Sequence, residues 1–81
     1  MSSWWVYIVR CADGTLYTGI STNVEKRIAT HNSGKGAKYT RTRTPVSLCK
    51  CWEWPDRSSA SKEEYRIKQL TRAEKLQLIS E

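Results

Sequence analysis

Aromatic and β-branched residues fill the first regular stretch of the chain, Trp4 to Val9, and this composition predicts a β-strand. Asp13-Gly14 follows, and this pair is a strong hairpin signal when apolar runs flank it. Residues 15–20 predict the returning strand. Gly19 inside that strand indicates that another group approaches the backbone closely there. The chain is therefore expected to open with an antiparallel hairpin.

Polar residues able to start a helix follow the hairpin. Thr22 and Glu25 have the spacing of a capping box, which predicts a helix beginning near Asn23. Gly34 is a natural C-terminal stop for that helix. The next segment, residues 35–44, contains glycine, lysine, arginine and threonine but no acidic residue, and we interpret it as a loop. It is called the basic loop below.

Hydrophobic and polar positions alternate from Val46 to Trp52, which predicts a third strand. Side chains two positions apart lie on the same face of a strand. Cys49 and Cys51 are therefore expected on one face, as small buried hydrophobic residues. Trp52 and Trp54 would share a face in the same way.

Two helices are expected after this strand. Asp56 can cap the first, and residues 71–74, Thr-Arg-Ala-Glu, form a capping box for the second, which would carry Leu76 and Ile79 inward. The resulting order β-β-α-β-α-α predicts an α+β fold, with helices flanking a three-stranded antiparallel sheet. The length of 81 residues predicts a single domain, residues 1–81.

The charge balance favours a polyanionic partner. The chain has 14 Lys and Arg against 8 Asp and Glu, a formal net charge of +6, and nucleic acid is the usual partner for such a surplus. A soluble protein that is merely basic remains the simpler alternative. The longest apolar run, Trp4 to Val9, is far shorter than the about 20 residues that span a bilayer, and no signal peptide is evident. We therefore expect a cytoplasmic protein with no membrane association.

Disulfide and zinc frameworks are disfavoured. The chain has three cysteines, an odd number, and Cys49-x-Cys51 lacks the spacing of a zinc knuckle. His31 is the single histidine.

Five side chains could converge to do chemistry. Tyr7 and Tyr17 lie on the two hairpin strands, close to opposite each other, so the two phenols could share a surface. Arg27 and His31 are four positions apart and lie on one helix face. Glu64 is expected early in the second helix. Each has a plainer interpretation: strand aromatics for the tyrosines, solvated helix residues for Arg27 and His31, and a capping partner for Glu64.

The basic loop is a separate candidate for nucleic-acid contacts. It interleaves cations with one aromatic ring, a mixture that suits phosphate contacts beside a stacking surface. The residues concerned are Lys35, Lys38, Tyr39, Arg41 and Arg43. The alternative is a solvated charged loop. Gly34-Lys35-Gly36 does not have the spacing of a Walker A loop.

Together these residues resemble the GIY-YIG endonuclease family, and in particular its small stand-alone bacterial members. The segments that carry the resemblance are Val6-Tyr7-Ile8, Leu16-Tyr17-Thr18-Gly19-Ile20, Arg27 with His31, Gly34 to Arg41, and Glu64-Tyr65-Arg66-Ile67-Lys68. It extends from Trp4 to about Leu78. Two positions depart from the family motifs: Trp5 stands where the first has Gly, and Thr18 where the second has Ile.

The resemblance implies the GIY-YIG fold and hydrolysis of DNA phosphodiester bonds, dependent on Mg²⁺ or Mn²⁺ and without an organic cofactor. It identifies Tyr7, Tyr17, Arg27, His31 and Glu64 as catalytic residues, with Glu64 the metal ligand. Low sequence specificity or structure selectivity is expected, since the extra DNA-binding domains of larger members are missing from this sequence. A monomer and a homodimer both remain open.

These residues suggest a division of roles. Arg27 would neutralise charge on the phosphate, Tyr17 would activate water with His31 passing on the proton, and Tyr7 would orient the water or the phosphate. Two other functions compete with the nuclease. One is a nucleic-acid-binding module with little or no hydrolytic activity. The other is a protein-interaction domain that exposes Trp52 and Trp54.

Overall fold

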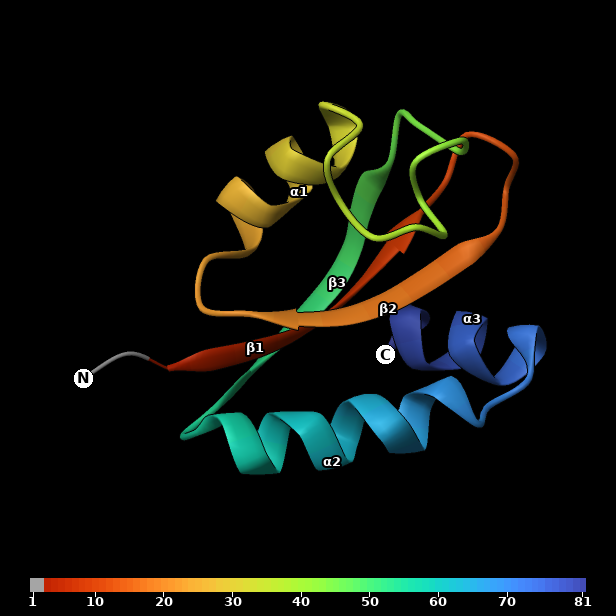
Figure 1. The fold of residues 1–81 in the computed structure, drawn as a ribbon. Coiled ribbons are helices and arrows are strands. Elements are labelled where there is room, and N and C mark those ends of the chain that lie inside the picture. Colours follow the sequence, from red (N-terminus) through yellow and green to blue (C-terminus); the bar gives the residue numbers. More distant parts are fainter. Residues whose placement is uncertain (1–2) are drawn as a thin grey trace.

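The computed structural model describes residues 3–81, which form three strands and three helices in the predicted order (Figure 1). The elements are β1 (Trp4–Arg10), β2 (Leu16–Ser21), α1 (Val24–Asn32), β3 (Ser47–Trp54), α2 (Arg57–Lys68) and α3 (Arg72–Ser80). The α+β prediction is therefore confirmed. None of the described helices is long and apolar enough to cross a membrane.

The sheet has the order β2-β1-β3, and both pairings are antiparallel. Tyr7 on β1 is paired with Gly19 on β2, whereas Tyr17 is paired with Val9. The two tyrosines are therefore diagonal neighbours. The sequence predicts that they lie close to opposite each other, and the structure corrects this by an offset of two residues. The offset still leaves them on one face, because the pairing positions differ by two residues.

The two faces of the sheet carry separate cores. On one face, Val6 and Ile8 pack against Ala60 and Ile67 of α2, and the half-buried residues around them include Trp52, Trp54, Leu78 and Ile79. Figure 1 shows α2 and α3 on this side of the sheet and α1 with the basic loop on the other. The tryptophans thus belong to the core, which removes the basis for a domain that presents them to partners. Leu76, expected to point inward, is 44% exposed.

The second core contains Tyr7, Val9, Cys11 and Val46, with half-buried side chains of α1 around them. Tyr7 is therefore buried in the core under α1, and it is 1% exposed. This face also holds the polar groups described in the next section.

A β-bulge corrects the prediction for the cysteines. The register between β1 and β3 shifts between Ile8, paired with Lys50, and Val9, paired with Leu48. The extra residue changes which way the strand presents its side chains. Cys49 accordingly packs on the α2 side and Cys51 on the Tyr7 side.

The helix ends are capped by side chains, in one case differently from the prediction. Asn23, rather than a Thr22–Glu25 capping box, caps α1 by accepting a hydrogen bond from the amide of Lys26. Asp56 caps α2, so Glu64 lies well inside that helix and does not cap its start. The predicted box of Thr71 with Glu74 is confirmed.

Thr18, one of the two departures from the family motifs, is buried at the centre of β2. It is paired with Ile8 and is 2% exposed. Its hydroxyl has no hydrogen-bond partner among the described residues. A buried hydroxyl without a partner lowers stability.

Candidate active site

A chain of hydrogen bonds runs through the interior between β1, α1 and the basic loop. The Tyr7 hydroxyl lies 2.8 Å from Nε2 of His31, and Nδ1 of the same ring lies 2.7 Å from Oγ1 of Thr40. The Thr40 hydroxyl also donates to the carbonyl oxygen of Ala37 at 3.0 Å. His31 and Thr40 are both fully buried. The bond between His31 and Thr40 is therefore shielded from water, and the Tyr7 hydroxyl forms the end of the hydrogen-bond chain that lies against Gly19 of the edge strand β2.

The last bond of this chain determines where its protons are. A threonine hydroxyl has one proton, and Thr40 gives it to the Ala37 carbonyl. Thr40 must then accept a hydrogen bond from Nδ1–H of His31. In a neutral imidazole this leaves Nε2 unprotonated, so Tyr7 donates its hydroxyl proton to it. His31 is therefore positioned to receive the Tyr7 proton.

Two glycines make room for the Tyr7–His31 pair. A Cβ atom on Gly19 would lie 2.5 Å from the Tyr7 hydroxyl oxygen, so the phenol lies directly on the β2 backbone. A Cβ atom on Gly36 would lie 2.8 Å from Cγ of His31. Real side-chain contacts are not this short, so both positions require glycine. The prediction that a group approaches Gly19 closely is confirmed.

Burial moves the pKa values of the two groups apart. It raises the pKa of Tyr7, and the nearby Tyr17 and Glu64 add to that effect while Arg27 opposes it. Burial also lowers the pKa of His31, and the positive charge of Arg27 lowers it further. At neutral pH the proton therefore stays on Tyr7, and His31 is an uncharged acceptor.

Tyr17 borders this buried pair but is not hydrogen-bonded to it. Its ring meets His31 edge-on, with 5.6 Å between centroids, and stacks on Tyr39 of the basic loop at 5.7 Å and 22°. Tyr17 is half-buried, so it is more accessible than Tyr7. The hydrogen bond of His31 goes to Tyr7 and not to Tyr17, so the structure favours Tyr7 as the tyrosine that His31 serves.

Glu64 approaches from the opposite side of the sheet. Its side chain on α2 is 23% exposed, and its carboxylate lies 3.3 Å from Nζ of Lys68, one turn further along the helix. That ammonium group lies 5.7 Å from the centre of the Tyr17 ring. Since β2 is an edge strand, Glu64 and Lys68 stand beside the edge at which Tyr17 lies.

The donor set around Glu64 limits which metal could bind. No group of three His, Cys, Asp or Glu side chains able to hold a metal ion occurs within residues 3–81. A zinc-type site therefore has no basis there. Mg²⁺ binds through one or two carboxylates together with water and substrate phosphate oxygens, and a single carboxylate fits that pattern. Lys68 would have to release Glu64 on metal binding.

Arg27 of α1 lines a groove on the tyrosine side of the sheet. The groove has a volume of about 190 Å³ and is lined by Ser21, Thr22, Asn23, Lys26, Arg27 and Thr30. Arg27 is half-buried, and its charge acts on both Tyr7 and His31. Hydroxyl groups and two cations in one groove suit an anionic group.

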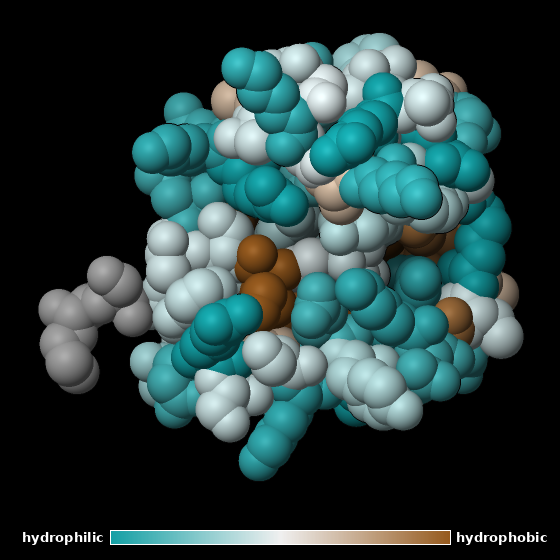
Figure 2. Space-filling view, in the orientation of Figure 1, coloured by the Kyte–Doolittle hydropathy of each residue, from teal (hydrophilic) through white to brown (hydrophobic). Residues whose placement is uncertain are grey.

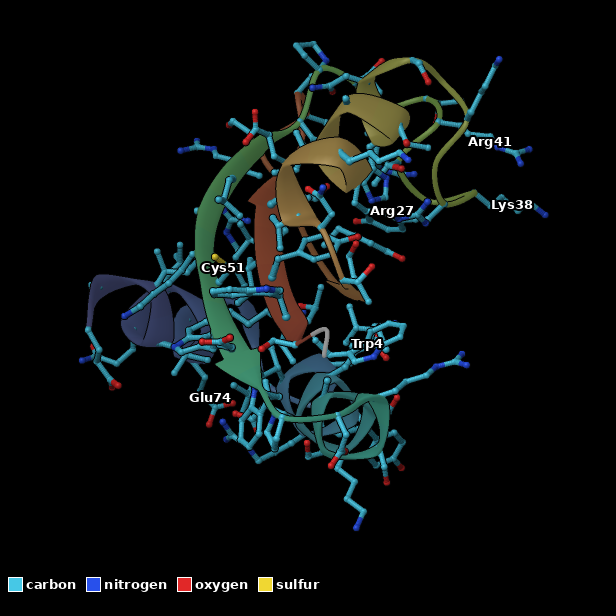
Figure 3. The ribbon with its side chains drawn as sticks, turned by 90° about the vertical axis from the view of Figure 1, so that its left-hand side faces the viewer. Trp4, Arg27, Lys38, Arg41, Cys51 and Glu74 are labelled. Atoms are coloured by element: carbon cyan, nitrogen blue, oxygen red, sulfur yellow. The ribbon has the colours of Figure 1, made fainter. Side chains whose placement is uncertain are left out.

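The predicted nucleic-acid contacts of the basic loop divide into two groups. Lys35, Lys38 and Arg41 are exposed, and Figure 3 shows Lys38 and Arg41 extending away from the fold. Figure 2 shows hydrophilic side chains over α1 and this loop, above a small hydrophobic hollow near the middle of that face. The role of Lys35, Lys38 and Arg41 in binding nucleic acid stays a prediction.

Arg43 and Tyr39, by contrast, already contact other residues of the fold through the groups that would bind nucleic acid. Nε of Arg43 lies 3.0 Å from the Asp13 carboxylate, and its Nη1 donates to the Tyr39 carbonyl at 2.7 Å. The guanidinium also lies 4.1 Å from the centre of the Tyr39 ring. Arg43 therefore ties the loop to the β1–β2 turn. Tyr39 is 39% exposed, but a base would compete with Tyr17 and Arg43 for its ring.

Sequence reasoning missed two members of the site. The sequence places Thr40 only within a loop segment, because nothing local indicates that its hydroxyl bonds a helix residue nine positions earlier. Lys68 could have been found, since a glutamate followed four positions later by a lysine is a usual helical ion pair.

Comparison with known families gives one match over most of the chain. Residues 3–77 match the family model described as the GIY-YIG catalytic domain. A UPF0213 protein of Staphylococcus haemolyticus is 54% identical over 81 residues, which covers 100% of this chain and 99% of that protein. A UPF0213 protein of Halobacterium salinarum is 56% identical over 70 residues, covering 86% of this chain and 91% of that protein.

Two solved structures are similar to this fold. The solution NMR structure of a UPF0213 protein from Bacillus halodurans has a TM-score of 0.62 and 49% identity, and the match covers 96% of this chain and 83% of that one. The solution NMR structure of a protein from E. faecalis has a TM-score of 0.66 and 40% identity, with 99% and 85% covered.

Proposed function

This chain belongs to the GIY-YIG family, and from that premise we propose that it is a divalent-metal-dependent nuclease that hydrolyses phosphodiester bonds of DNA. The observation that carries the proposal is the buried chain from Tyr7 through His31 to Thr40, which provides a phenol with a proton acceptor behind it. Binding alone needs no such arrangement.

Tyr7 and His31 would move the proton of the attacking water. Free tyrosine is a poor base because its phenolate forms only near pH 10. A phenol that receives a proton from water while giving its own to His31 avoids that costly phenolate. The water oxygen then attacks phosphorus and the leaving oxygen departs from it. The leaving oxygen takes up a proton from solvent, and the proton held by His31 returns through Tyr7 to solvent, which restores the starting state.

Arg27 and Tyr17 would hold the phosphate. Arg27 lies in a groove with a second cation and several hydroxyl groups, where its charge would stabilise the negative charge that develops on the phosphate oxygens. The half-buried Tyr17 would position the phosphate at the β2 edge, between the Tyr7–His31 pair and Glu64.

Glu64 would hold the metal ion, Mg²⁺ or Mn²⁺, at the β2 edge. When bound there, the metal polarises a phosphate oxygen and stabilises the charge on the leaving oxygen. The Glu64 carboxylate supplies one oxygen ligand, and Lys68, once displaced, stays near Tyr17 as a further cation for the substrate.

A polyanionic substrate agrees with the charge of the chain, +6 overall, and with the exposed cations of the basic loop. GIY-YIG nucleases act on nucleic acids, and we propose DNA, cleaved with little sequence specificity or with a preference for a particular DNA structure. Lys35, Lys38 and Arg41 would contact the sugar-phosphate backbone, which carries no sequence information.

The test is cleavage of end-labelled plasmid, duplex, single-stranded and branched DNA with Mg²⁺, Mn²⁺ or EDTA. The proposal expects metal-dependent cutting by the parent protein and its loss in Glu64→Gln. Glu63→Gln is the matched control, because Glu63 is the neighbouring residue on α2 and pairs with Arg66 on the surface. Cutting that survives in Glu64→Gln, or that EDTA does not affect, would contradict the proposal.

One observation favours a second function, a nucleic-acid-binding module with little or no hydrolysis. Glu64 is paired with Lys68, so a metal ion would have to displace that ammonium group to reach the carboxylate. DNA binding that is identical in the parent protein and in Glu64→Gln, without cutting by either, would support this alternative.

A further inference from the structure

A second cationic groove lies where β2 begins. It has a volume of about 180 Å³ and is lined by Thr15, Leu16, Tyr39, Arg72 and Lys75. Two of these residues are cations of α3, one is an aromatic ring and one has a hydroxyl group. None was predicted from the sequence to bind a ligand, apart from Tyr39.

The cations of this groove have no acidic partner. Within residues 3–81 the ion pairs join Arg43 to Asp13, Arg66 to Glu63 and Lys68 to Glu64. Neither Arg72 nor Lys75 takes part in any of them. Glu74, the acidic residue between them, accepts a hydrogen bond from the amide of Thr71 at 2.8 Å. The groove therefore has a net positive charge that nothing in the described chain neutralises.

One of the cations is held in place. Nη1 of Arg72 donates to the carbonyl oxygen of Gly14 at 2.7 Å, which fixes the guanidinium against the β1–β2 turn. Its remaining N–H groups are available for an anion, because a guanidinium has five donors. Lys75 is half-buried, so its stem lies against the fold.

The groove is adjacent to the candidate active site. Tyr39 forms part of its wall and stacks on Tyr17, and Leu16 directly precedes Tyr17 on β2. The Arg27 groove reaches the other end of the same strand at Ser21. Figure 1 shows α3 near the start of β2 and α1 near its end. The two cationic grooves thus stand at opposite ends of one edge strand.

The separation of the grooves suits a nucleic-acid strand. Five residue steps along β2, from Leu16 to Ser21, cover about 17 Å. At 3.4 Å per nucleotide along one strand, this corresponds to about five stacked nucleotides. Tyr17 lies on β2 between these ends, and Tyr7 lies beside it on β1, paired with Gly19.

We infer that the α3 groove is a second phosphate-binding subsite for nucleic acid, so that one substrate strand follows the β2 edge from Arg27 to Lys75. The inference rests on the proposed function for its ligand but concerns binding and not hydrolysis. Arg72 and Lys75 would contact backbone phosphates a few nucleotides away from the cleaved bond, and the exposed part of Tyr39 lines the same groove.

The experiment measures binding of a fluorescent twelve-nucleotide single strand by Glu64→Gln protein, with EDTA present, between 0.05 and 1 M salt. Lys75→Gln is the principal variant because Arg72 also has a structural bond. Loss of one phosphate contact reduces the slope of log K against log salt by about 0.7 and the affinity about fivefold at 0.1 M salt. Lys75→Arg should restore both.

Lys62→Gln is the matched control, since Lys62 is an exposed lysine of α2 that lines neither groove. Combining Arg27→Gln with Lys75→Gln should reduce the slope by about 1.4, with one strand bound per protein, because two independent contacts to one strand add. An unchanged slope in Lys75→Gln, an equal loss in Lys62→Gln, or no measurable binding at all would overturn the inference. Cleavage by the parent protein is scored separately, so the nuclease proposal and the subsite can fail independently.

Discussion

The hydroxyl of Tyr7 donates a hydrogen bond to Nε2 of His31 across 2.8 Å, although the two residues are 24 positions apart. The direction of this bond is fixed from a distance by Thr40, whose own proton is used by the Ala37 carbonyl. The buried phenol therefore has a neutral base behind it. This relationship separates Tyr7 from Tyr17, which meets the same imidazole only with the edge of its ring.

Tyr7→Phe should therefore remove hydrolysis but not binding. The variant lacks the atom that would pass a proton to His31, and loss of general acid–base assistance typically slows a reaction 10²- to 10⁴-fold, roughly. It also leaves Nε2 of His31 buried without a donor, which costs about 1–3 kcal/mol of stability. Single-turnover cleavage and DNA affinity, measured on the folded fraction, check this. Tyr17→Phe is the comparison, and a larger loss of rate there than in Tyr7→Phe would assign the base to Tyr17.

Stability should decrease as the pH falls below about 6.5. Burial and the charge of Arg27 lower the pKa of His31 in the folded protein below its ordinary 6.5, so the unfolded chain binds this proton at a higher pH than the folded one does. The stabilisation is therefore complete above pH 6.5 and is lost as the pH falls toward the folded value. The lowered carboxyl pKa values of Asp13, Asp56 and Glu63 act in a lower range, below about pH 4.5.

Urea unfolding at pH 7.5, 6.5, 5.5 and 5.0 measures this effect. The free energy of unfolding of the parent protein should fall with a limiting slope of about 1.4 kcal/mol per pH unit, and His31→Gln should flatten the profile over the same range. Parallel profiles for the two proteins would contradict a lowered pKa at His31.

Thr18→Val should stabilise the protein. The Thr18 hydroxyl is buried without a partner, and valine has nearly the same shape without the polar group. Removing an unsatisfied buried polar group recovers about 1–3 kcal/mol, which would appear as a higher midpoint of urea unfolding. Thr15→Val, at a threonine whose hydroxyl donates to Asp13 at 2.6 Å, is the control and should not stabilise. A destabilised Thr18→Val would imply a water or ligand bound at this hydroxyl.

The cations of the basic loop should differ in what they contribute. Lys38→Gln and Arg41→Gln each remove an exposed charge and should reduce the salt slope of single-strand binding by about 0.7. Arg43→Gln breaks the contacts with Asp13 and Tyr39 and should mainly lower stability and loosen the loop. Salt titrations beside thermal unfolding separate the two effects. A salt slope that changes most in Arg43→Gln would reverse these roles.

The fold could be predicted because its signals are local. The capping residue Asp56 and the Thr71–Glu74 box act within one helical turn, and the alternation around Trp52 is a property of one strand. The register of the hairpin was less accessible. Residues 11–15 connect β1 to β2, so the Asp13-Gly14 turn does not set the pairing of Tyr7 with Gly19 by itself. The bulge that places Cys49 and Cys51 on different faces arises from the pairing of β3 with β1. The alternation of residues within β3 alone therefore cannot reveal it.

The site was accessible only in part for the same reason. The sequence offers Tyr7, Tyr17, Arg27, His31 and Glu64 as candidates, and family resemblance gives them roles that stay predictions. In the structure Tyr7, Tyr17 and His31 are in contact, whereas Glu64 lies on α2, on the other side of the sheet. Which tyrosine His31 serves depends on the diagonal offset of the hairpin. The hydrogen-bond direction depends on Thr40, a loop residue whose position results from packing. Arg43 joins the loop to Asp13 of the β1–β2 turn, and Asn32 of α1 bonds the backbone of Val46 just after the loop.

The buried hydrogen-bond chain from Tyr7 to Thr40 couples the orientation of His31 to the folding of the whole protein. Its three members come from a strand, a helix and a loop, and Tyr7 lies 24 positions before His31, so no single helix or strand contains all three. A nascent or heat-damaged molecule that has lost the packing of the basic loop loses the orientation of His31 at the same moment. Under the proposed function, the capacity to move a proton from water would therefore appear only in the folded protein.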